Sequence, residues 1–97
     1  MNTPEACESL AQLRAEIDRI DAQIVPLLAE RGAYVLAAAR FKKSGEEVRA
    51  PQRVEQVIAR VRALAEAHGA MPDVVERIYR ELIEAFTEAE HRRWSRP

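Results

Sequence analysis

The sequence predicts an all-α fold in which one long helix at the N-terminal end is followed by two shorter ones. Ala, Glu, Arg and Leu dominate the 97 residues, with only three glycines and two phenylalanines, a composition typical of helices. Apolar residues recur three and four positions apart from Leu10 to Phe41, which is the spacing of one helix face. No segment alternates apolar and polar residues as a β-strand would.

The long helix is expected to begin near Ser9 and to end between Lys42 and Gly45. Ser9 and Gln12 have the S-x-x-Q spacing of a capping box. At the other end, cationic side chains favour a helix C-terminus, and Gly45 can adopt the left-handed capping conformation. The apolar seam between these ends is formed by Leu10, Leu13, Ile17, Ile20, Ile24, Leu27, Tyr34, Ala38 and Phe41.

Two residues inside this stretch oppose a continuous helix. Pro26 lacks a backbone N–H, and its ring clashes with the carbonyl group of Ala22, at a cost of ~3 kcal/mol. Gly32 costs about 1 kcal/mol more. The apolar spacing nevertheless passes through both residues without a change of phase. We therefore expect a kinked but continuous helix, and the alternative is a helical hairpin near Pro26.

The length of this helix predicts an oligomer. It would extend for ~50 Å at ~1.5 Å per residue, whereas the mean helix in globular proteins has roughly 11–12 residues. A chain of 97 residues cannot cover both ends of such a rod by itself. A second copy of the chain is therefore expected to cover part of it.

Two more helices are expected after a polar loop at residues 46–50. Pro51 suits the first position of the middle helix, which Gly69 should stop. Pro72 and Asp73 suit the start of the last helix, which Trp94 should close. The apolar stripe of the middle helix comprises Val54, Val57, Ile58, Val61, Leu64 and Ala65, and that of the last helix comprises Val75, Ile78, Tyr79, Leu82, Ile83 and Phe86, followed by Glu90 and Arg93.

Length and charge narrow the class of protein. The chain is short enough for one domain, residues 1–97. Its 15 basic and 16 acidic residues give a net charge of −1, so no field of one sign can attract nucleic acid or a membrane. There is no signal-peptide pattern and no apolar run near the ~20 residues that span a bilayer. The single cysteine, Cys7, allows no internal disulfide. A cytoplasmic protein is expected.

Polar residues at apolar positions indicate a candidate site. Arg31 takes the seam position between Leu27 and Tyr34, where an isolated guanidinium would be costly without an anionic partner. Lys42 follows 11 residues later, on the same face of a continuous helix and ~16 Å along its axis. The two side chains would leave room for a small organic acid. The alternative is an internal salt bridge plus a solvated helix end.

Three more charged residues have two interpretations each. Arg14 lies ~25 Å from Arg31 along the rod and roughly 100° around it, so it is either a surface residue or part of a partner chain's pocket. Glu90 lies on the apolar stripe of the last helix. It is either a desolvated carboxyl with a functional role or one partner of a structural ion pair. Arg53 faces away from the apolar centre of its helix and, taken alone, fits a surface charge.

These groups restrict the chemistry. No His, Cys, Asp and Glu cluster has metal-ligand spacing, no nucleophile–base pair is suggested, and no glycine-rich phosphate loop is present. Cations and one carboxyl remain. They suit a substrate that bears carboxylates and a reaction that needs no nucleophile.

The motifs around these residues resemble a known family. The pattern L-x-x-L-R-x-x-I-D-x-I-D around Arg14, L-L-A-E-R ending at Arg31, F-K at Lys42 and V-R-A-P-x-R-V-x-x-V around Arg53 are similar to those of the all-α chorismate mutases. The resemblance covers roughly residues 3–94. The segments T-P-E-x-C, R-F-K and A-P-x-R-V are most similar to those of the isochorismate pyruvate lyases in salicylate and siderophore pathways.

The resemblance implies a fold and a set of roles. It implies an intertwined homodimer with two equivalent sites, in which Arg14 enters the site of the other chain. Arg14 and Arg31 would hold the substrate carboxylates, with Arg53 in support. Lys42 and Glu90 would contact the ether oxygen of the breaking bond. The implied substrate-binding residues also include Ala50, Val54 and Phe86.

Two departures from the family pattern bear on the substrate. Typical bacterial mutases of this class have carboxylates at the positions of Ala50 and Val54, where they bind the C4 hydroxyl of chorismate. Isochorismate lacks that hydroxyl, so an apolar lining favours the lyase. The second departure is Glu90, because lyases and most bacterial mutases of this class have Gln there. Glu90 can donate a hydrogen bond only when protonated, so activity is expected to fall as the pH rises.

The resemblance, together with these residues, thus implies a pericyclic enzyme that needs no cofactor and converts isochorismate to salicylate and pyruvate, with chorismate mutase activity as a side reaction. Residues 43–50 are expected to act as a lid after Lys42. One alternative is a dedicated chorismate mutase of aromatic amino acid synthesis. Another is a non-enzymatic helical dimer, although its balanced charge disfavours nucleic acid as a partner.

Overall fold

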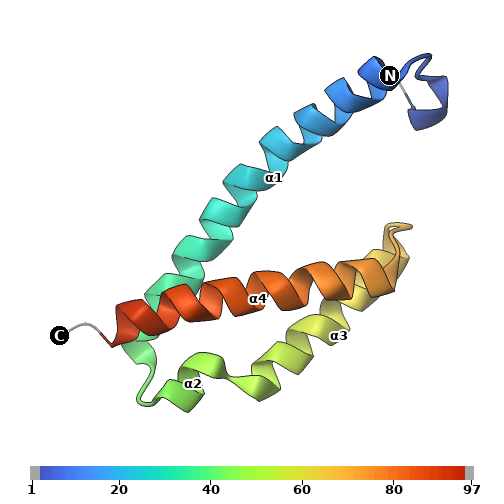
Figure 1. Ribbon diagram of the computed structural model, residues 1–97. Coiled ribbons are helices and arrows are strands. Elements are labelled where there is room, and N and C mark those ends of the chain that lie inside the picture. Colours follow the sequence, from blue (N-terminus) through green and yellow to red (C-terminus); the bar gives the residue numbers. More distant parts are fainter. Residues whose placement is uncertain (1–2, 96–97) are drawn as a thin grey trace. The chain divides into compact units, whose positions relative to one another are not determined.

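The computed structural model describes residues 3–95, and every regular element within this range is helical (Figure 1). The elements are the 3₁₀ turn η1 (Pro4–Ala6), α1 (Leu10–Ala38), the 3₁₀ turn η2 (Ala39–Phe41), α2 (Gly45–Arg49), α3 (Pro51–Ala67) and α4 (Pro72–Trp94). The predicted all-α class is confirmed, and α1, α3 and α4 are the three expected helices. The chain divides into two compact units, one up to Ala33 and one from Tyr34.

Helix α1 begins where the capping box predicts. The amide of Gln12 donates to Ser9 Oγ (3.1 Å), and Gln12 Oε1 in return accepts from the amide of Glu8 (2.7 Å). Two backbone N–H groups that have no partner inside the helix are thus satisfied by side chains. A short local pattern is therefore sufficient to set this helix start.

Helix α1 is continuous through Pro26 and the buried Gly32. The expected continuity is confirmed, and the alternative of a hairpin near Pro26 is wrong. Pro26 removes one backbone hydrogen bond, but the apolar residues before and after it stay on one face only if the helix continues. The expected kink stays a prediction.

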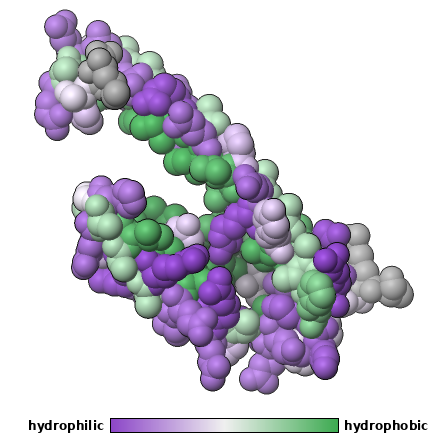
Figure 2. Space-filling view, turned by 180° about the vertical axis from the view of Figure 1, so that it is seen from behind, coloured by the Kyte–Doolittle hydropathy of each residue, from purple (hydrophilic) through white to green (hydrophobic). Residues whose placement is uncertain are grey.

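The apolar residues of α1 are exposed in the single chain. Leu13 is 37% exposed, Ile17 55%, Ile24 45% and Leu27 62%. Figure 2 shows hydrophobic residues lying in a row along this helix. Within the first unit, only η1 accompanies the helix, so no element of that unit can bury the row. An exposed apolar row of this length is typical of an interaction surface.

In the second unit, α3 and α4 form an antiparallel hairpin (Figure 1). Gly69 ends α3, as predicted, with a positive φ of 72°. The amide of Ala70 donates to the carbonyl of Ala65 and that of Gly69 to Glu66, which is the hydrogen-bond pattern of a Schellman motif. Pro72 then opens α4.

The core of the second unit is small. Its buried apolar side chains are Ala39 from η2, Val48 from α2, and Val57, Ile58, Val61 and Ala65 from α3. Four of these belong to the predicted stripe of the middle helix. Leu64 and Ile78, also assigned to stripes, are 49% and 58% exposed, so the predicted stripes are wider than the core of one chain.

The segment between α1 and α3 differs from the prediction. The α-helix ends at Ala38, and Lys42 is extended, with φ −89° and ψ 140°. Gly45 does not cap α1. It is instead the first residue of α2, which replaces the expected loop. Ser44 Oγ accepts from the amide of Glu47 (3.2 Å), and Glu47 Oε2 accepts from the amide of Lys43 (2.8 Å).

Two features explain why α2 begins at Gly45. The capping interactions of Ser44 and Glu47 satisfy amides at the start of a helix, so the chain gains hydrogen bonds by beginning a new helix here. A Cβ atom on Gly45 would lie 3.3 Å from Nε2 of His91 in α4. The absence of a side chain therefore lets the start of α2 approach α4.

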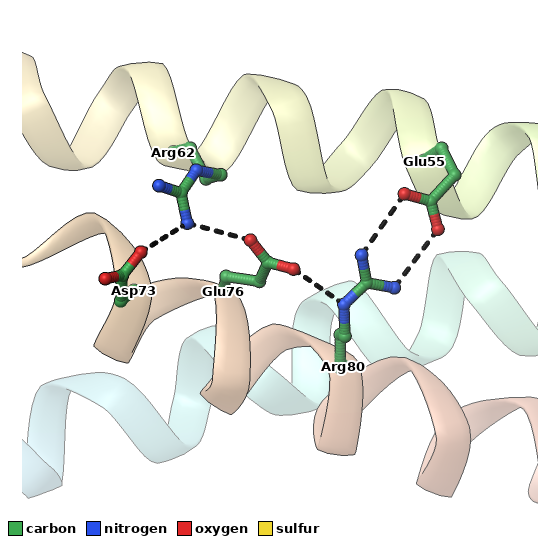
Figure 3. A network of polar contacts seen from close by, with 5 residues as sticks. All are labelled: Glu55, Arg62, Asp73, Glu76 and Arg80. Atoms are coloured by element: carbon green, nitrogen blue, oxygen red, sulfur yellow. Dashed lines mark hydrogen bonds and ion pairs between the residues drawn. The ribbon is translucent and has the colours of Figure 1, made fainter.

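Charged residues connect α3 to α4 on the surface of the hairpin (Figure 3). Arg62 of α3 contacts Asp73 (2.9 Å) and Glu76 (2.8 Å), and Arg80 of α4 contacts Glu76 (2.8 Å) and Glu55 (3.1 Å). The hydrogen bonds to Arg80 lower the pKa of Glu55 and of Glu76. The same contacts raise the pKa of Arg80. Because these groups are solvated, water and salt screen their attraction.

No helix in the described part of the chain is both long enough and apolar enough to cross a membrane.

Candidate active site

A buried carboxyl and an ammonium group lie together in the second unit. Glu90, on α4, is only 4% exposed. Lys42 Nζ lies 3.4 Å from Glu90 Oε2 and donates a hydrogen bond of 2.9 Å to the carbonyl oxygen of Glu47. The contact with Glu90 is long for a hydrogen bond, and Oε2 has no hydrogen-bond partner among the described residues. The pair is therefore an ion pair with a buried oxygen that can still form a hydrogen bond.

The position of Glu90 follows from the helix period. It lies one turn after the half-buried Phe86 and two turns after Ile83, on the apolar stripe of α4. The expected burial of its carboxyl is confirmed. A buried polar oxygen without a hydrogen bond is uncommon in folded proteins, so this position is a candidate for contact with a ligand.

Lys42 is positioned at both its backbone and its side chain. Its amide donates to the carbonyl of Ala39 (3.1 Å), and its own carbonyl accepts from Nε1 of Trp94 (3.0 Å). The side chain is 23% exposed. The ammonium group is thus held in a partly desolvated position, where its charge acts more strongly than in water.

An open pocket of about 660 Å³ connects Lys42 to two of the predicted binding residues, Ala50 and Arg53. Glu47 and Pro51 also line it. Ala50 ends α2 and precedes α3 with a positive φ of 43°. The Ala50 methyl group contributes no hydrogen-bonding atom to this lining. The structure therefore brings Lys42, Ala50 and Arg53 to one pocket, with Glu90 paired to Lys42.

The remaining predicted residues do not line this pocket. Val54 is half-buried on α3, and Phe86 is half-buried on α4. Arg14 and Arg31 belong to the first unit, where Arg14 is exposed and Arg31 is partly buried. The predicted spacing of ~16 Å between Arg31 and Lys42 assumed that both residues lie on one continuous helix. That assumption is wrong, because the α-helix ends at Ala38 and Lys42 is extended.

Glu47 and Trp94 contact Lys42 as well, and neither is among the predicted site residues. Glu47 had a local signal, because Ser44 and Glu47 have the S-x-x-E spacing of a capping box, which indicates a helix start next to Lys42. Trp94 carried no signal beyond closing the last helix, because its partner lies 52 residues away. Among residues 3–95, no group of His, Cys, Asp and Glu is arranged to hold a metal ion.

This architecture and site define a class of helical proteins with a lysine–carboxyl pair beside an open pocket. Residues 13–91 match the family model of chorismate mutase type II, and the chain belongs to that family. It is 38% identical over 94 residues to an isochorismate pyruvate lyase of Pseudomonas aeruginosa. The aligned region covers 97% of this chain and 93% of that protein. It is 33% identical over 78 residues to a chorismate mutase of Methanocaldococcus jannaschii, and the aligned region covers 79% of each chain. Both relatives are named as enzymes.

Proposed function

We propose that this protein is an isochorismate pyruvate lyase, which converts isochorismate to salicylate and pyruvate and has chorismate mutase activity as a side reaction. Residues 1–97 would act as one chorismate mutase-type domain. The observation that carries the proposal is the position of Lys42. Its ammonium group lies next to the buried Glu90 and lines the same pocket as Ala50 and Arg53.

The proposed chemistry needs no covalent intermediate. As the ether bond of the substrate breaks, negative charge develops on its oxygen, and a preorganised ammonium group stabilises that charge. Lys42 supplies this group. Glu90, when protonated, donates a hydrogen bond to the same oxygen. Arg53 at the pocket, with Arg14 and Arg31, would hold the carboxylates so that the substrate stays in its reactive conformer.

The preference for isochorismate rests on Ala50, which lines the pocket and whose side chain offers no hydrogen bond to a hydroxyl group. Val54, one helical turn further on and outside the lining, is apolar as well. A pocket that leaves a substrate hydroxyl without a partner loses the free energy of that hydrogen bond on desolvation. The relative from Pseudomonas aeruginosa, named as a lyase over nearly the same length, supports the same choice.

The complete site requires an intertwined homodimer in this proposal. The apolar row of α1, including Ile17 and Ile24, is exposed in the single chain and suits burial against a second copy. Arg14 is exposed on the same helix and would enter the site of the partner. Within the first unit only η1 accompanies this helix, so a partner chain would supply the burial of its apolar row.

A dedicated chorismate mutase is the second candidate. The relative from Methanocaldococcus jannaschii, 33% identical and named as a chorismate mutase, favours it. In that case the cations alone would hold chorismate, and the apolar Ala50 and Val54 would leave its hydroxyl to water.

The deciding experiment compares kcat/KM for purified isochorismate and chorismate at pH 5.5 and 7.5. We expect a clear preference for isochorismate, and an Ala50→Asp variant should shift the ratio towards chorismate by restoring an acceptor. A preference of the unaltered chain for chorismate would support the mutase. Turnover of neither substrate would contradict both.

A further inference from the structure

Helix α4 contacts both ends of the residue proposed to be catalytic. Glu90 and Trp94 are four residues apart, so they lie on the same face of α4. Glu90 Oε2 lies 3.4 Å from Nζ of Lys42, and Trp94 Nε1 donates a 3.0 Å hydrogen bond to the carbonyl oxygen of Lys42. Figure 1 shows the C-terminal end of α4 beside the segment from η2 to α2, which carries Lys42. One helix face thus holds the side chain and the backbone of a single residue.

The backbone of Lys42 has little support of its own. Lys42 is extended between η2 and α2, so its carbonyl is outside the hydrogen-bond ladder of either helix. The indole N–H of Trp94 is the donor that the structure gives to this carbonyl. Because a peptide plane rotates as a unit, fixing the carbonyl oxygen also restrains the direction in which the lysine side chain leaves the backbone.

We propose that Trp94 is a positioning residue for Lys42, and that its N–H group, rather than its ring alone, sets the catalytic geometry. The proposal rests on the lyase or mutase function proposed above. An ammonium group stabilises a developing charge only if it is already in place when the charge appears. Losing the hydrogen bond would let the peptide turn and leave the ammonium group misplaced for part of the time.

The indole ring of Trp94 also packs against the ring of His91, and this contact could stabilise the fold without any effect on Lys42. The rings of Trp94 and His91 have centroids 5.7 Å apart at an angle of 56°. A purely structural tryptophan would act through this packing. The two roles are separable, because Trp94→Phe keeps an aromatic ring but removes the N–H donor. Since Trp94 is the single tryptophan of the chain, 3-benzothienylalanine can replace it with nearly the shape of indole and no N–H.

The test measures kcat and KM of the Trp94→Phe and benzothienylalanine variants on the preferred substrate. We expect both to lower kcat roughly tenfold, the loss of about one hydrogen bond, with little change in KM, because other cations hold the substrate carboxylates. Ser95→Ala is the matched control. It removes the hydrogen bond from Ser95 Oγ to the carbonyl of Arg92 at the same helix end and should keep the full rate.

A double-mutant cycle with Lys42→Ala tests whether Trp94 acts through Lys42. In that background, the benzothienylalanine substitution should lower the rate less than about twofold. The inference is overturned if the shape-matched variant keeps the kcat of the unaltered chain, or if its loss is equally large without Lys42. These outcomes differ from failure of the proposed function, in which the unaltered chain itself turns over neither isochorismate nor chorismate.

Discussion

At the residue scale, the site depends on an unusual pair. Glu90 and Lys42 place a carboxyl and an ammonium group 3.4 Å apart where water has little access, so their electrostatic interaction is weakly screened. The role proposed for Glu90, however, requires a proton on its carboxyl. Glu90 Oε2 lies 3.4 Å from Lys42 Nζ and has no hydrogen-bond partner among the described residues, so it can still form a hydrogen bond with a ligand. The protonation of Glu90 should therefore control the rate.

Replacement of Lys42 tests the electrostatic role directly. We expect Lys42→Ala to lower kcat/KM by at least roughly 10²–10³-fold, as removal of an oxyanion-type donor does. The helical circular dichroism signal should be retained, because the Lys42 side chain forms no part of the apolar core. A near-normal rate would exclude Lys42 from the mechanism.

The pH profile tests the role of Glu90. Only a protonated carboxyl can donate to the ether oxygen, so log kcat should be higher at acidic pH than at alkaline pH. Glu90→Gln carries an amide that donates at every pH and should give a flat profile with a higher rate at neutral pH. A flat profile from pH 5 to 9 for the unaltered chain would contradict this role.

At the scale of elements, the contacts between α3 and α4 divide into an apolar core and a surface network. The core is made by residues such as Val57 and Val61. The network of Arg62, Glu76 and Arg80 lies on the surface (Figure 3). Apolar burial supplies most of the stability of such a hairpin, whereas the network makes the stability dependent on pH.

The sign of this dependence follows from the carboxyl groups. Because the pKa of Glu55 and that of Glu76 are lower in the folded chain, their stabilising effect is complete above the unfolded value of about 4.3. It is lost as the pH falls through the lower folded values. Melting temperatures should therefore fall below about pH 5.

A Glu55→Gln/Glu76→Gln double variant should show a smaller fall in melting temperature between pH 6 and 3 than the unaltered chain. The difference should shrink at 0.5 M salt, because salt screens exposed ion pairs. Glu84→Gln, on α4 and outside the network, is the matched control. Equal pH dependence of the double variant and the unaltered chain would show that the network does not contribute.

At the scale of the whole molecule, the proposed dimer would take Arg14 of each site from the partner chain. If Arg14 enters the partner's site, a mixed dimer of Arg14→Ala and Lys42→Ala chains contains one intact site and one site with both changes. Random mixing makes about half of the dimers mixed, so co-refolded chains should recover about one quarter of the full rate. Each variant alone should stay inactive.

The control mixes Lys42→Ala with Glu90→Ala. Lys42 and Glu90 contact each other within one chain, so no mixed dimer of these two variants contains an intact site, and no activity should return. Recovery in this control, or none in the Arg14 mixture, would contradict donation of Arg14 across the interface. Analytical ultracentrifugation of the same samples should give the mass of a dimer.

The sequence by itself determined the three long helices, α1, α3 and α4, and most of their ends. Ser9 with Gln12, Gly69 and Pro72 act on backbone groups within about one turn, so these boundaries can be predicted without knowing what packs nearby. The same holds for burial of Glu90, because the helix period assigns it to the apolar face. The capping box of Ser44 and Glu47 is an equally local signal, and it marks the start of α2 where the apolar spacing alone would continue the long helix.

Only the tertiary structure decided how Lys42 is held. The hydrogen bond from Trp94 joins residues 52 positions apart, and the close approach of Gly45 to His91 depends on the packing of α2 against α4. Such contacts arise from the placement of whole helices, and no local preference of either residue predicts them. Local hydrogen bonding thus makes the helices predictable from sequence, whereas the geometry of Lys42 depends on where helix α4 packs.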